Sequence, residues 1–422
     1  MSVPSHIARS VVDPKAYGDG SVLESFRWLR ANDPCALIEV EKFNPFRVLT
    51  RYADVQTVGR RSDVFTNAPY SVLSPKVSQQ KIREMTGGNT MIKTLIDMDG
   101  AEHGAYRGLT AAWFQPGNLK KLEGRVRELA RNAVDQMMAT GGECDFVNEI
   151  ALHYPLLVIM ESLGLPDADE PLMLKLTQEL FGATDPELNE RGTGSQNVED
   201  DDQEIDMTTI LELMAYFQAL TEDRRRQPTD DLTSLIANAR IDGAPMPDME
   251  TMGYYIITAT AGHDTTSSST AGAMWKLAEN PDQLRLVKEN PALIGGLIDE
   301  AIRWFSPVNH FMRTATQDTE VNGQTIAKGE WLMLSWLSAN RDESVFEDPD
   351  AFRVDRKPNR HVAFGYGPHL CLGQYLARME MRILFEELLP RLRHVELAGD
   401  PAMSEAVFVN GPKRLPIRFT MT

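Results

Sequence analysis

The sequence predicts a mostly α-helical protein with a small β portion. Apolar residues at helical spacing dominate the 422-residue chain, and the longest such pattern covers residues 248–279. Segments with the alternating pattern of strands are few, and no internal repeat is present. Hydrophobic residues make up 42% of the chain, and no Pro-, Gly- or Ser-rich linker divides it. We therefore expect residues 1–422 to form a single domain with one large core.

Composition and charge exclude several classes of protein. The formal net charge of −18 argues against nucleic acids and anionic membranes as partners. No run of eighteen apolar residues is present, and the first ten residues lack the apolar core of a signal peptide. Cys35, Cys144 and Cys371 lie far apart, which favours neither a disulfide framework nor a zinc site. We expect a soluble protein of a reduced, cytoplasmic compartment, and a monomer.

The first half of the chain predicts one strand and several helices. The strand covers residues 46–51, and a long irregular segment rich in Gly, Ser and Pro follows at 67–98. Three helical patterns come next, at residues 119–138, 155–163 and 170–181. The Gly- and Asp-rich segment 182–202 is predicted to be a mobile loop with a solvated acidic run.

The second half is predicted to contain the longest helix and a β-hairpin. Pro281 ends the helix of residues 248–279, and another helix begins near Pro291 and ends before Ser306. Asn322-Gly323 and Lys328-Gly329 mark turns of a β-hairpin that extends from residue 320 to 334.

The middle of the long helix is unusual for a buried helix. Residues 259–270 read Ala-Thr-Ala-Gly-His-Asp-Thr-Thr-Ser-Ser-Ser-Thr, and Gly, Ser and Thr are poor residues for a helix interior. A helix that is weakened at its centre usually has a local function there. Gly262 would leave a gap over a flat cofactor, and Asp264 and Thr265 form an acid–alcohol pair suited to proton transfer. A solvated polar helix face is the alternative, and His263 fits either a packed histidine or a part in proton transfer.

A second informative segment surrounds Cys371. Residues 364–373 read Phe-Gly-Tyr-Gly-Pro-His-Leu-Cys-Leu-Gly, with Cys371 at the eighth position. Glycines let backbone approach a flat ligand closely and leave N–H groups free to point at sulfur. A thiolate that accepts such hydrogen bonds can serve as an axial ligand of haem iron. The alternative is a glycine-rich turn beside a buried structural cysteine.

Both segments resemble motifs of the cytochrome P450 monooxygenases. The spacing Phe-Gly-x-Gly-x-His-x-Cys-x-Gly resembles the family's haem-binding loop, and Gly262-His-Asp-Thr265 resembles its central-helix motif. The resemblance extends over essentially the whole chain and is greatest with soluble, ferredoxin-dependent bacterial members. It implies the family's fold, with haem b between a long central helix and the Cys371 loop. Cys371 would bind the iron, with Phe364, Gly365, Gly373 and Gly262 against the cofactor.

The resemblance also assigns charged residues and a scaffold. Arg and His side chains would bind the two haem propionates, which are carboxylates. The four basic residues at the family's positions are His103, Arg107, Arg313 and His369. Glu300 and Arg303 share a helix face, and together with Arg356 they would form a buried structural ion network behind the cysteine loop.

The function implied is oxidation of a small hydrophobic substrate. Asp264 and Thr265 would supply protons while one atom of O2 is inserted into a C–H bond. The expected substrate is a monoterpene such as terpineol, or an alkyl-aromatic hydrocarbon. By position, the candidate substrate residues are Ile257, Thr258, Ala261, Val308, Asn309, Phe311 and Phe408.

The chain has no flavin or iron–sulfur motif of its own. Electrons from NAD(P)H would therefore come through separate proteins, a [2Fe–2S] ferredoxin and its reductase. Their docking face would surround Cys371, with Arg378, Arg360 and Lys120 or Lys121 as its cations. A haem-thiolate peroxygenase that uses H2O2 and a non-enzymatic haem-binding sensor are the alternatives. The acid–alcohol pair argues against the first, because a peroxygenase does not need it.

Overall fold

The computed structural model describes residues 3–182, 184–189 and 204–422. The predicted mostly α-helical architecture with a small β portion is confirmed. The α-helices are α1 (Ser5–Ser10), α2 (Pro14–Gly18), α3 (Val22–Asn32), α4 (Tyr52–Arg60), α5 (Lys76–Thr86), α6 (Gly100–Ala111), α7 (Pro116–Leu119), α8 (Glu123–Ala139), α9 (His153–Leu163), α10 (Glu170–Phe181), α11 (Thr208–Arg226), α12 (Leu232–Ala237), α13 (Asp248–Glu279), α14 (Pro281–Glu289), α15 (Ile294–Phe305), α16 (Trp336–Ala339) and α17 (Gln374–Leu388). Short helical turns of other types are η1 (Leu95–Asp97), η2 (Val147–Ala151), η3 (Asp167–Asp169), η5 (Pro291–Leu293) and η6 (Gly367–His369).

The strands form small sheets at the edge of the helical body. They are β1 (Cys35–Ile38), β2 (Phe46–Leu49), β3 (Phe65–Thr66), β4 (Glu143–Asp145), β5 (Arg240–Ile241), β6 (Ala244–Pro245), β7 (His310–Ala315), β8 (Thr319–Val321), β9 (Gln324–Ile326), β10 (Trp331–Ser335), β11 (Leu392–Leu397), β12 (Ala402–Met403), β13 (Pro412–Arg414) and β14 (Pro416–Met421). The largest sheet has the order β1-β2-β10-β7-β3. In it only β2 and β10 pair in parallel, while a second sheet has the order β11-β14-β4.

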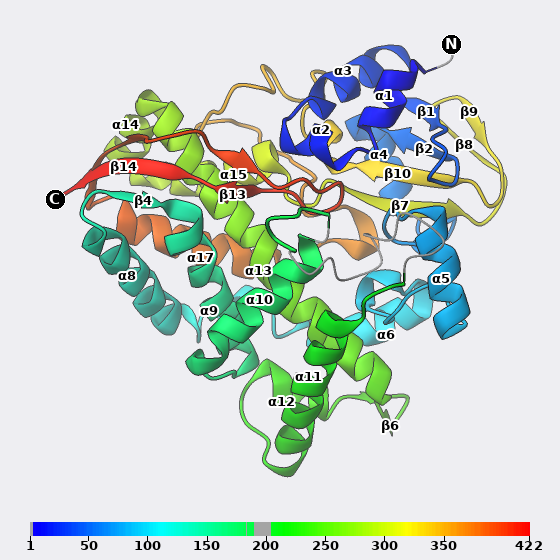
Figure 1. The fold of residues 1–422 in the computed structure, drawn as a ribbon, viewed down its shortest axis with the longest axis horizontal. Helices are drawn as coiled ribbons and strands as arrows, with labels where there is room; N and C mark the ends of the chain where they lie inside the picture. The colour runs from blue at the N-terminus through cyan, green and yellow to red at the C-terminus, as the bar shows by residue number, and fades with distance from the viewer. Residues whose placement is uncertain (1–2, 183, 190–203) are drawn as a thin grey trace.

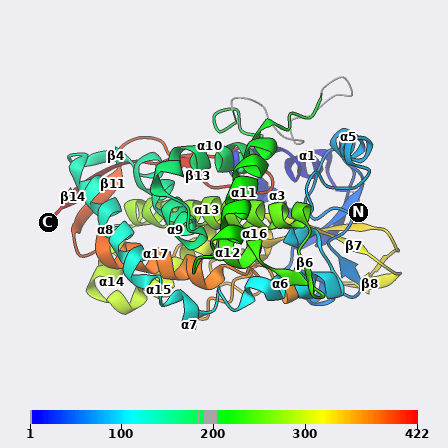
Figure 2. The ribbon, with the colours of Figure 1, turned by 90° about the horizontal axis from the view of Figure 1, so that it is seen from below.

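Helix α13 passes through the middle of the helical part in both views (Figures 1 and 2). It packs against α9, α10, α11, α15 and α17, so the largest hydrophobic cluster surrounds it. The sheet of β1, β2, β10, β7 and β3 lies with α1–α4 at the other end of the molecule (Figure 1). No helix in the described part of the chain has the length and apolar character needed to cross a bilayer.

Several predicted elements need correction. Residues 67–98 are not wholly irregular, because they contain α5 and η1. The predicted hairpin of residues 320–334 is only partly right: β8 and β9 pair with each other, but β10 pairs with β7 and β2. Most of the predicted mobile loop, residues 183 and 190–202, lies outside the described residues. That residues 1–422 form one domain stays a prediction.

Candidate functional site

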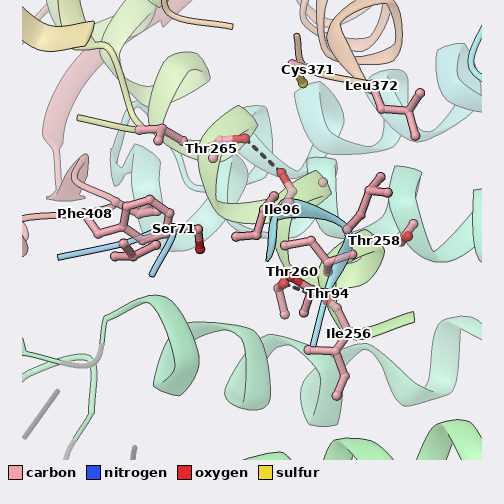
Figure 3. A pocket seen from close by; sticks show the side chains of 18 of the residues that line it. Ser71, Thr94, Ile96, Ile256, Thr258, Thr260, Thr265, Cys371, Leu372 and Phe408 are labelled. Atoms are coloured by element: carbon pink, nitrogen blue, oxygen red, sulfur yellow. Dashed lines mark hydrogen bonds between the residues drawn. The ribbon is translucent and has the colours of Figure 1, made fainter. Parts of the chain in front are cut away.

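A large cavity of about 510 Å³ lies between α13 and the loop that carries Cys371. This volume is in the range of cavities that enclose small ligands. In Figure 3, Cys371 lies at one end of the cavity, while Ile96, Thr258, Thr265 and Phe408 line other sides. The site is therefore built from three distant parts of the chain: the segment around Ile96, the centre of α13, and the C-terminal quarter.

The shape of the Cys371 loop depends on two glycines with left-handed backbone. Gly365 and Gly367 have φ angles of 76° and 81°, a region that favours glycine. A Cβ on Gly367 would overlap the carbonyl oxygen of Gly59, so α4 and this loop are in direct backbone contact. The Cys371 N–H donates to the Phe364 carbonyl over 2.8 Å and closes the loop, which leaves Cys371 on the cavity wall.

The surroundings of the Cys371 thiol have opposing effects on its charge. Burial raises the pKa of Cys371, while the backbone N–H groups of Gly373 and Gln374 and the charges of Arg107 and Arg378 lower it. The two N–H groups belong to the beginning of α17, where a helix favours negative charge. These N–H groups and charges would therefore stabilise the thiolate form of Cys371 once a cation binds the sulfur. In the described part of the chain no three His, Cys, Asp or Glu side chains gather as a metal site, so an iron on Cys371 needs its other ligands from a cofactor.

A group of basic side chains lies beside the loop. The rings of His103 and His369 lie against each other at a tilt of 32°, with centroids 4.0 Å apart. Arg107 donates to the Leu370 carbonyl over 2.6 Å, and Arg313 donates to the Met312 carbonyl over 2.7 Å. The sequence predicted all four of these basic residues as part of the site. Arg313, however, lies behind the cavity wall rather than on it.

This basic group contains few anions. Asp99 is the nearest carboxylate, 3.8 Å from His369, and it also accepts N–H bonds from Asn67 and Ala68. Burial lowers the pKa of Arg313 to about 10, and burial with the neighbouring His369 and Arg107 charges lowers that of His103 to about 4. In the described part of the chain neither Arg107 nor Arg313 is in an ion pair with a carboxylate. Buried cations need anionic partners, so the group fits a ligand with two carboxylates, as haem b has.

Thr265 and Asp264 face different cavities. Thr265 lies on the wall of the large cavity, and its hydroxyl donates to the Ala261 carbonyl over 3.0 Å (Figure 3). Asp264 is instead on a smaller chamber on another side of α13. Burial raises the pKa of Asp264, and the charge of His263 opposes that effect.

Five hydroxyls in the central part of α13 are satisfied within the helix, whereas the Thr270 hydroxyl is buried without a partner in the described part of the chain. The hydroxyls of Thr258, Thr260, Thr265, Ser267 and Ser269 each donate to the carbonyl four residues earlier. These bonds let polar side chains sit in a buried helix without unpaired protons. The run is therefore not a solvated helix face.

His263 is completely buried and packed between elements. Its Nδ1 lies 2.8 Å from the Thr177 hydroxyl on α10, and its Nε2 lies 2.8 Å from the Leu152 carbonyl. His263 thus joins α13 to α10 and to the segment after η2.

Gly262 packs closely against a neighbouring helix. A Cβ on Gly262 would lie 2.8 Å from two side-chain atoms of Ile159 on α9. Gly262 also lines the cavity, so the packing of α9 on α13 is a second reason for a small residue there, and the predicted gap over a cofactor stays a prediction.

Glu300, Arg303 and Arg356 form one buried network. Arg303 binds both Glu300 oxygens at 2.8 and 2.9 Å, and Arg356 Nε lies 3.0 Å from each. The side chain of Asn359 and the N–H of Arg353 also donate to Glu300. The sequence did not point to these last two donors, because neither has a recognisable spacing.

Six of the seven candidate substrate residues line the large cavity: Ile257, Thr258, Ala261, Val308, Phe311 and Phe408. Asn309 does not, which corrects that prediction. Its amide donates to the Val407 carbonyl over 3.1 Å, and its backbone N–H donates to the Phe408 carbonyl. Asn309 therefore anchors the segment of Phe408.

Glu380 and Trp336 are among the polar residues of the cavity that the sequence did not indicate. Glu380 on α17 is fully buried, and burial raises its pKa well above the usual range. Trp336 has a buried indole N–H with no hydrogen-bond partner in the described part of the chain. Glu380 could have been noticed, because it is a charged residue one helical turn after Leu376, on the buried face of α17. No feature of the sequence indicated Trp336.

One of the expected docking cations is already occupied. Arg378 lies 2.8 Å from Asp299 and stacks 4.3 Å over the Phe364 ring, so it packs under the cysteine loop. Arg360, Lys120 and Lys121 are exposed.

Comparisons with known proteins gave matches over most of the chain. A family model described as Cytochrome P450 matches residues 76–419. Cytochrome P450-terp from Pseudomonas sp is 47% identical over 422 residues, covering 99% of this chain and 98% of that protein. Linalool 8-monooxygenase from Pseudomonas putida is 32% identical, covering 96% of this chain and 97% of that protein. The crystal structure of CYP108D1 from Novosphingobium aromaticivorans superposes with a TM-score of 0.91 at 42% identity, with both chains fully covered.

Proposed function

The chain belongs to the cytochrome P450 family, and we propose that it hydroxylates a compact terpenoid, such as terpineol, or an alkyl-aromatic hydrocarbon. Like other members of its family, it is a haem b monooxygenase that uses O2. The observation that carries the substrate proposal is the apolar cavity at Cys371. Aliphatic and aromatic side chains of Ile257, Val308, Phe311 and Phe408 form much of its wall.

The bound haem supplies the redox chemistry: it activates O2 with two electrons, so that one oxygen atom enters the C–H bond and the other leaves as water. Cys371 would hold the iron through its thiolate, and the N–H groups of Gly373 and Gln374 would stabilise that charge. Phe364 and Gly365 would pack against the cofactor, and their positions on the cavity wall support this role.

The basic group orients the cofactor. His103, Arg107, Arg313 and His369 bind the two propionates and neutralise them. Asp99 keeps His369 in place, because its carboxylate lies 3.8 Å from the imidazole. Arg107 and Arg313 would thereby gain the anionic partners that buried cations require, and the two imidazoles would supply hydrogen bonds.

Thr265 and Asp264 supply protons to the reacting oxygen. Thr265 presents its hydroxyl to the cavity and holds a proton at Oγ1. Asp264 transfers a proton toward Thr265, and burial raises the pKa of its carboxyl, which favours the protonated form. Ala261 and Phe311 exclude water from the same space.

Electrons reach the protein from a [2Fe–2S] ferredoxin and its reductase. Lys120 and Lys121 are exposed beside α7, which packs on α17, the helix that begins next to Cys371. These cations, with Arg360, suit an acidic partner in spite of the net charge of −18.

The substrate proposal is tested by titrating the ferric protein with monoterpene alcohols and alkylbenzenes. We expect the Soret band to shift as a fitting compound displaces water, followed by one hydroxylated product per turnover. Larger compounds of similar polarity, such as steroids, serve as controls and should give no shift. Tight binding of steroids with no response to terpenoids would overturn the proposal.

The iron ligand is tested separately. The reduced carbon-monoxide complex should have a strongly red-shifted Soret band, which Cys371→Ser and Cys371→His abolish together with monooxygenation. A wild-type protein that never shows this band would contradict thiolate ligation.

A further inference from the structure

A serine hydroxyl on the wall of the large cavity is held by a carboxylate. Ser71 Oγ donates to Asp97 Oδ1 over 2.6 Å, and both residues line the cavity. Figure 3 shows Ser71 apart from Cys371, on another side of the cavity. Ser71 is 5% exposed, so its hydroxyl is shielded from bulk solvent. The roles proposed for the cofactor and for proton transfer involve neither Ser71 nor Asp97.

Thr94 fixes the orientation of Asp97. The N–H and the hydroxyl of Thr94 both donate to Asp97 Oδ2, over 3.0 and 2.9 Å, in a capping box at the start of η1. Oδ1 is therefore the oxygen that is left for Ser71. The Ser71 backbone is fixed as well, because its carbonyl accepts the N–H of Met312 on β7 over 2.8 Å. This arrangement is in place before a ligand binds, so binding does not have to order it.

The bond to Asp97 determines what the Ser71 hydroxyl offers to a ligand. A hydroxyl has one proton to donate and two lone pairs that accept, whereas a carboxylate only accepts. Ser71 therefore directs its proton at Asp97, and its lone pairs are the groups that remain for a ligand. The carboxylate also strengthens Ser71 Oγ as an acceptor, because linked hydrogen bonds polarise one another. Ser71 thus favours a ligand that donates a hydrogen bond over one that only accepts.

We propose that Ser71 selects substrates that carry an alcohol, whose O–H donates to Ser71 Oγ. The inference rests on the proposed function and narrows its substrate to a terpenoid or alkyl-aromatic alcohol. A ketone of the same size has only lone pairs to bring against those of Ser71, and a hydrocarbon forms no hydrogen bond there. Asp97 and Thr94 act through Ser71 and are positioning residues.

Titration of the ferric protein with two matched series of compounds tests this selectivity. Terpineol, limonene and the methyl ketone with an acetyl group in place of the hydroxypropyl group of terpineol form the first series. Cumyl alcohol, cumene and acetophenone form the second. In a series that binds, the dissociation constant of the alcohol should be roughly tenfold lower than that of the ketone, as expected for one hydrogen bond. Equal affinity for alcohol and ketone would overturn the proposal.

Ser71→Ala should abolish this preference, because the acceptor is lost. Thr209→Val is the matched control, since the Thr209 hydroxyl lines the same cavity and donates to another carboxylate, that of Glu179, over 2.7 Å. This control should keep the wild-type preference. A Ser71→Ala protein with the wild-type preference, or a loss of preference in Thr209→Val alone, would place the alcohol elsewhere and overturn the proposal.

Asp97→Asn gives a readout that a merely structural role would not produce. The Thr94 N–H needs an acceptor, so the amide oxygen should take the place of Oδ2 and the amide NH2 that of Oδ1. The NH2 then donates to Ser71, whose own proton turns toward the ligand. The ketone should therefore bind roughly tenfold more tightly than it binds the wild type, while the affinity for the alcohol changes little. A folded variant that still prefers the alcohol would contradict the proposal, and if the variant does not fold, Ser71→Ala decides.

The titrations also separate this inference from the proposed function. Binding of either series without a preference for its alcohol would contradict the inference alone. If neither series shifts the Soret band, the proposed substrate class is wrong, and the inference is wrong with it.

Discussion

Asp264 and Thr265 are adjacent in sequence but should fail in different ways when substituted. Thr265→Ala should keep haem and substrate binding yet release reducing equivalents as hydrogen peroxide, because the cavity hydroxyl is lost. Asp264→Asn should slow turnover while the yield of product per NAD(P)H stays closer to wild type. Product and peroxide formed per NAD(P)H consumed measure both effects. If the yield of product per NAD(P)H is unchanged in Thr265→Ala, the Thr265 hydroxyl contributes only to helix packing.

His310 gives the protein a predictable sensitivity to acid. It is fully buried, accepts a bond from the Leu73 N–H and lies 3.2 Å from the Val407 carbonyl, and burial lowers its pKa to about 4. An ordinary histidine has a pKa of about 6.5, so the unfolded state binds more protons between pH 6.5 and 4. The stabilisation by neutral His310 is present above pH 6.5 and is lost as the pH falls toward 4, by about 3 kcal/mol.

This pH effect is measured by urea unfolding at intervals between pH 7 and 4. The free energy of unfolding should fall less steeply in His310→Gln than in wild type, because the amide keeps hydrogen-bonding groups but does not titrate. Parallel pH profiles of the two proteins would show that folding does not lower the pKa of His310.

The Glu300 network holds α15 to the segment of residues 353–359. Glu300 and Arg303 are fully buried and Arg356 is 7% exposed. Removal of one partner leaves a buried unpaired charge, so Glu300→Ala should lower the free energy of unfolding by about 3–5 kcal/mol and give haem-poor protein. Chemical denaturation and the ratio of Soret to protein absorbance check this. A stable, haem-loaded Glu300→Ala variant would contradict a structural role.

Close packing of α13 on the segment before η1 should control the shape of the substrate cavity. A Cβ on Gly253 would overlap the Lys93 carbonyl and lie 3.1 Å from Ile92 Cγ2. Gly253→Ala should displace this cavity-lining segment, weaken substrate binding and cost about 1–3 kcal/mol in stability. Gly124→Ala on α8 is the matched control, because nothing lies near its Cβ and alanine favours a helix. Equal substrate affinity in both variants would mean that the segment adapts freely.

The overall charge distribution predicts how the protein meets its electron donor. A charge of −18 repels an acidic ferredoxin, so local cations must offset it. Lys120→Glu with Lys121→Glu should slow reduction by ferredoxin several-fold, and added salt should slow the wild type. Lys15→Glu on α2 is the control, because α2 packs on β12 rather than on α17. Stopped-flow reduction rates that do not distinguish the two proteins would place docking elsewhere.

Elements with signals at their own ends were predictable from sequence. The bounds of α13 match the prediction, because Pro281 ends its pattern and Pro247 precedes it. Helix α5 was missed because most of its residues are polar. Its buried Ile82 packs against Ile205, which lies far along the chain. The pairing of β10 with β7 depends on similar distant contacts.

The same distinction holds for the site. The cysteine loop was predictable because its glycines and Cys371 act within ten residues of one another. The orientation of Asn309 away from the cavity was not, because it depends on the Val407 carbonyl. Nor could the sequence indicate that Lys413 lies on the same chamber as Asp264, 149 positions earlier by residue number.

Val409 has a consequence for anyone who wishes to redesign this enzyme. Its side chain borders both the large cavity and the smaller chamber that Asp264 lines, and its backbone bridges Val308. A library that varies position 409 to admit new compounds would alter the surroundings of Asp264, the proposed proton donor, at the same time. Selectivity and efficiency would then change together at this position, whereas changes at Phe311 or Ile257 affect the large cavity alone.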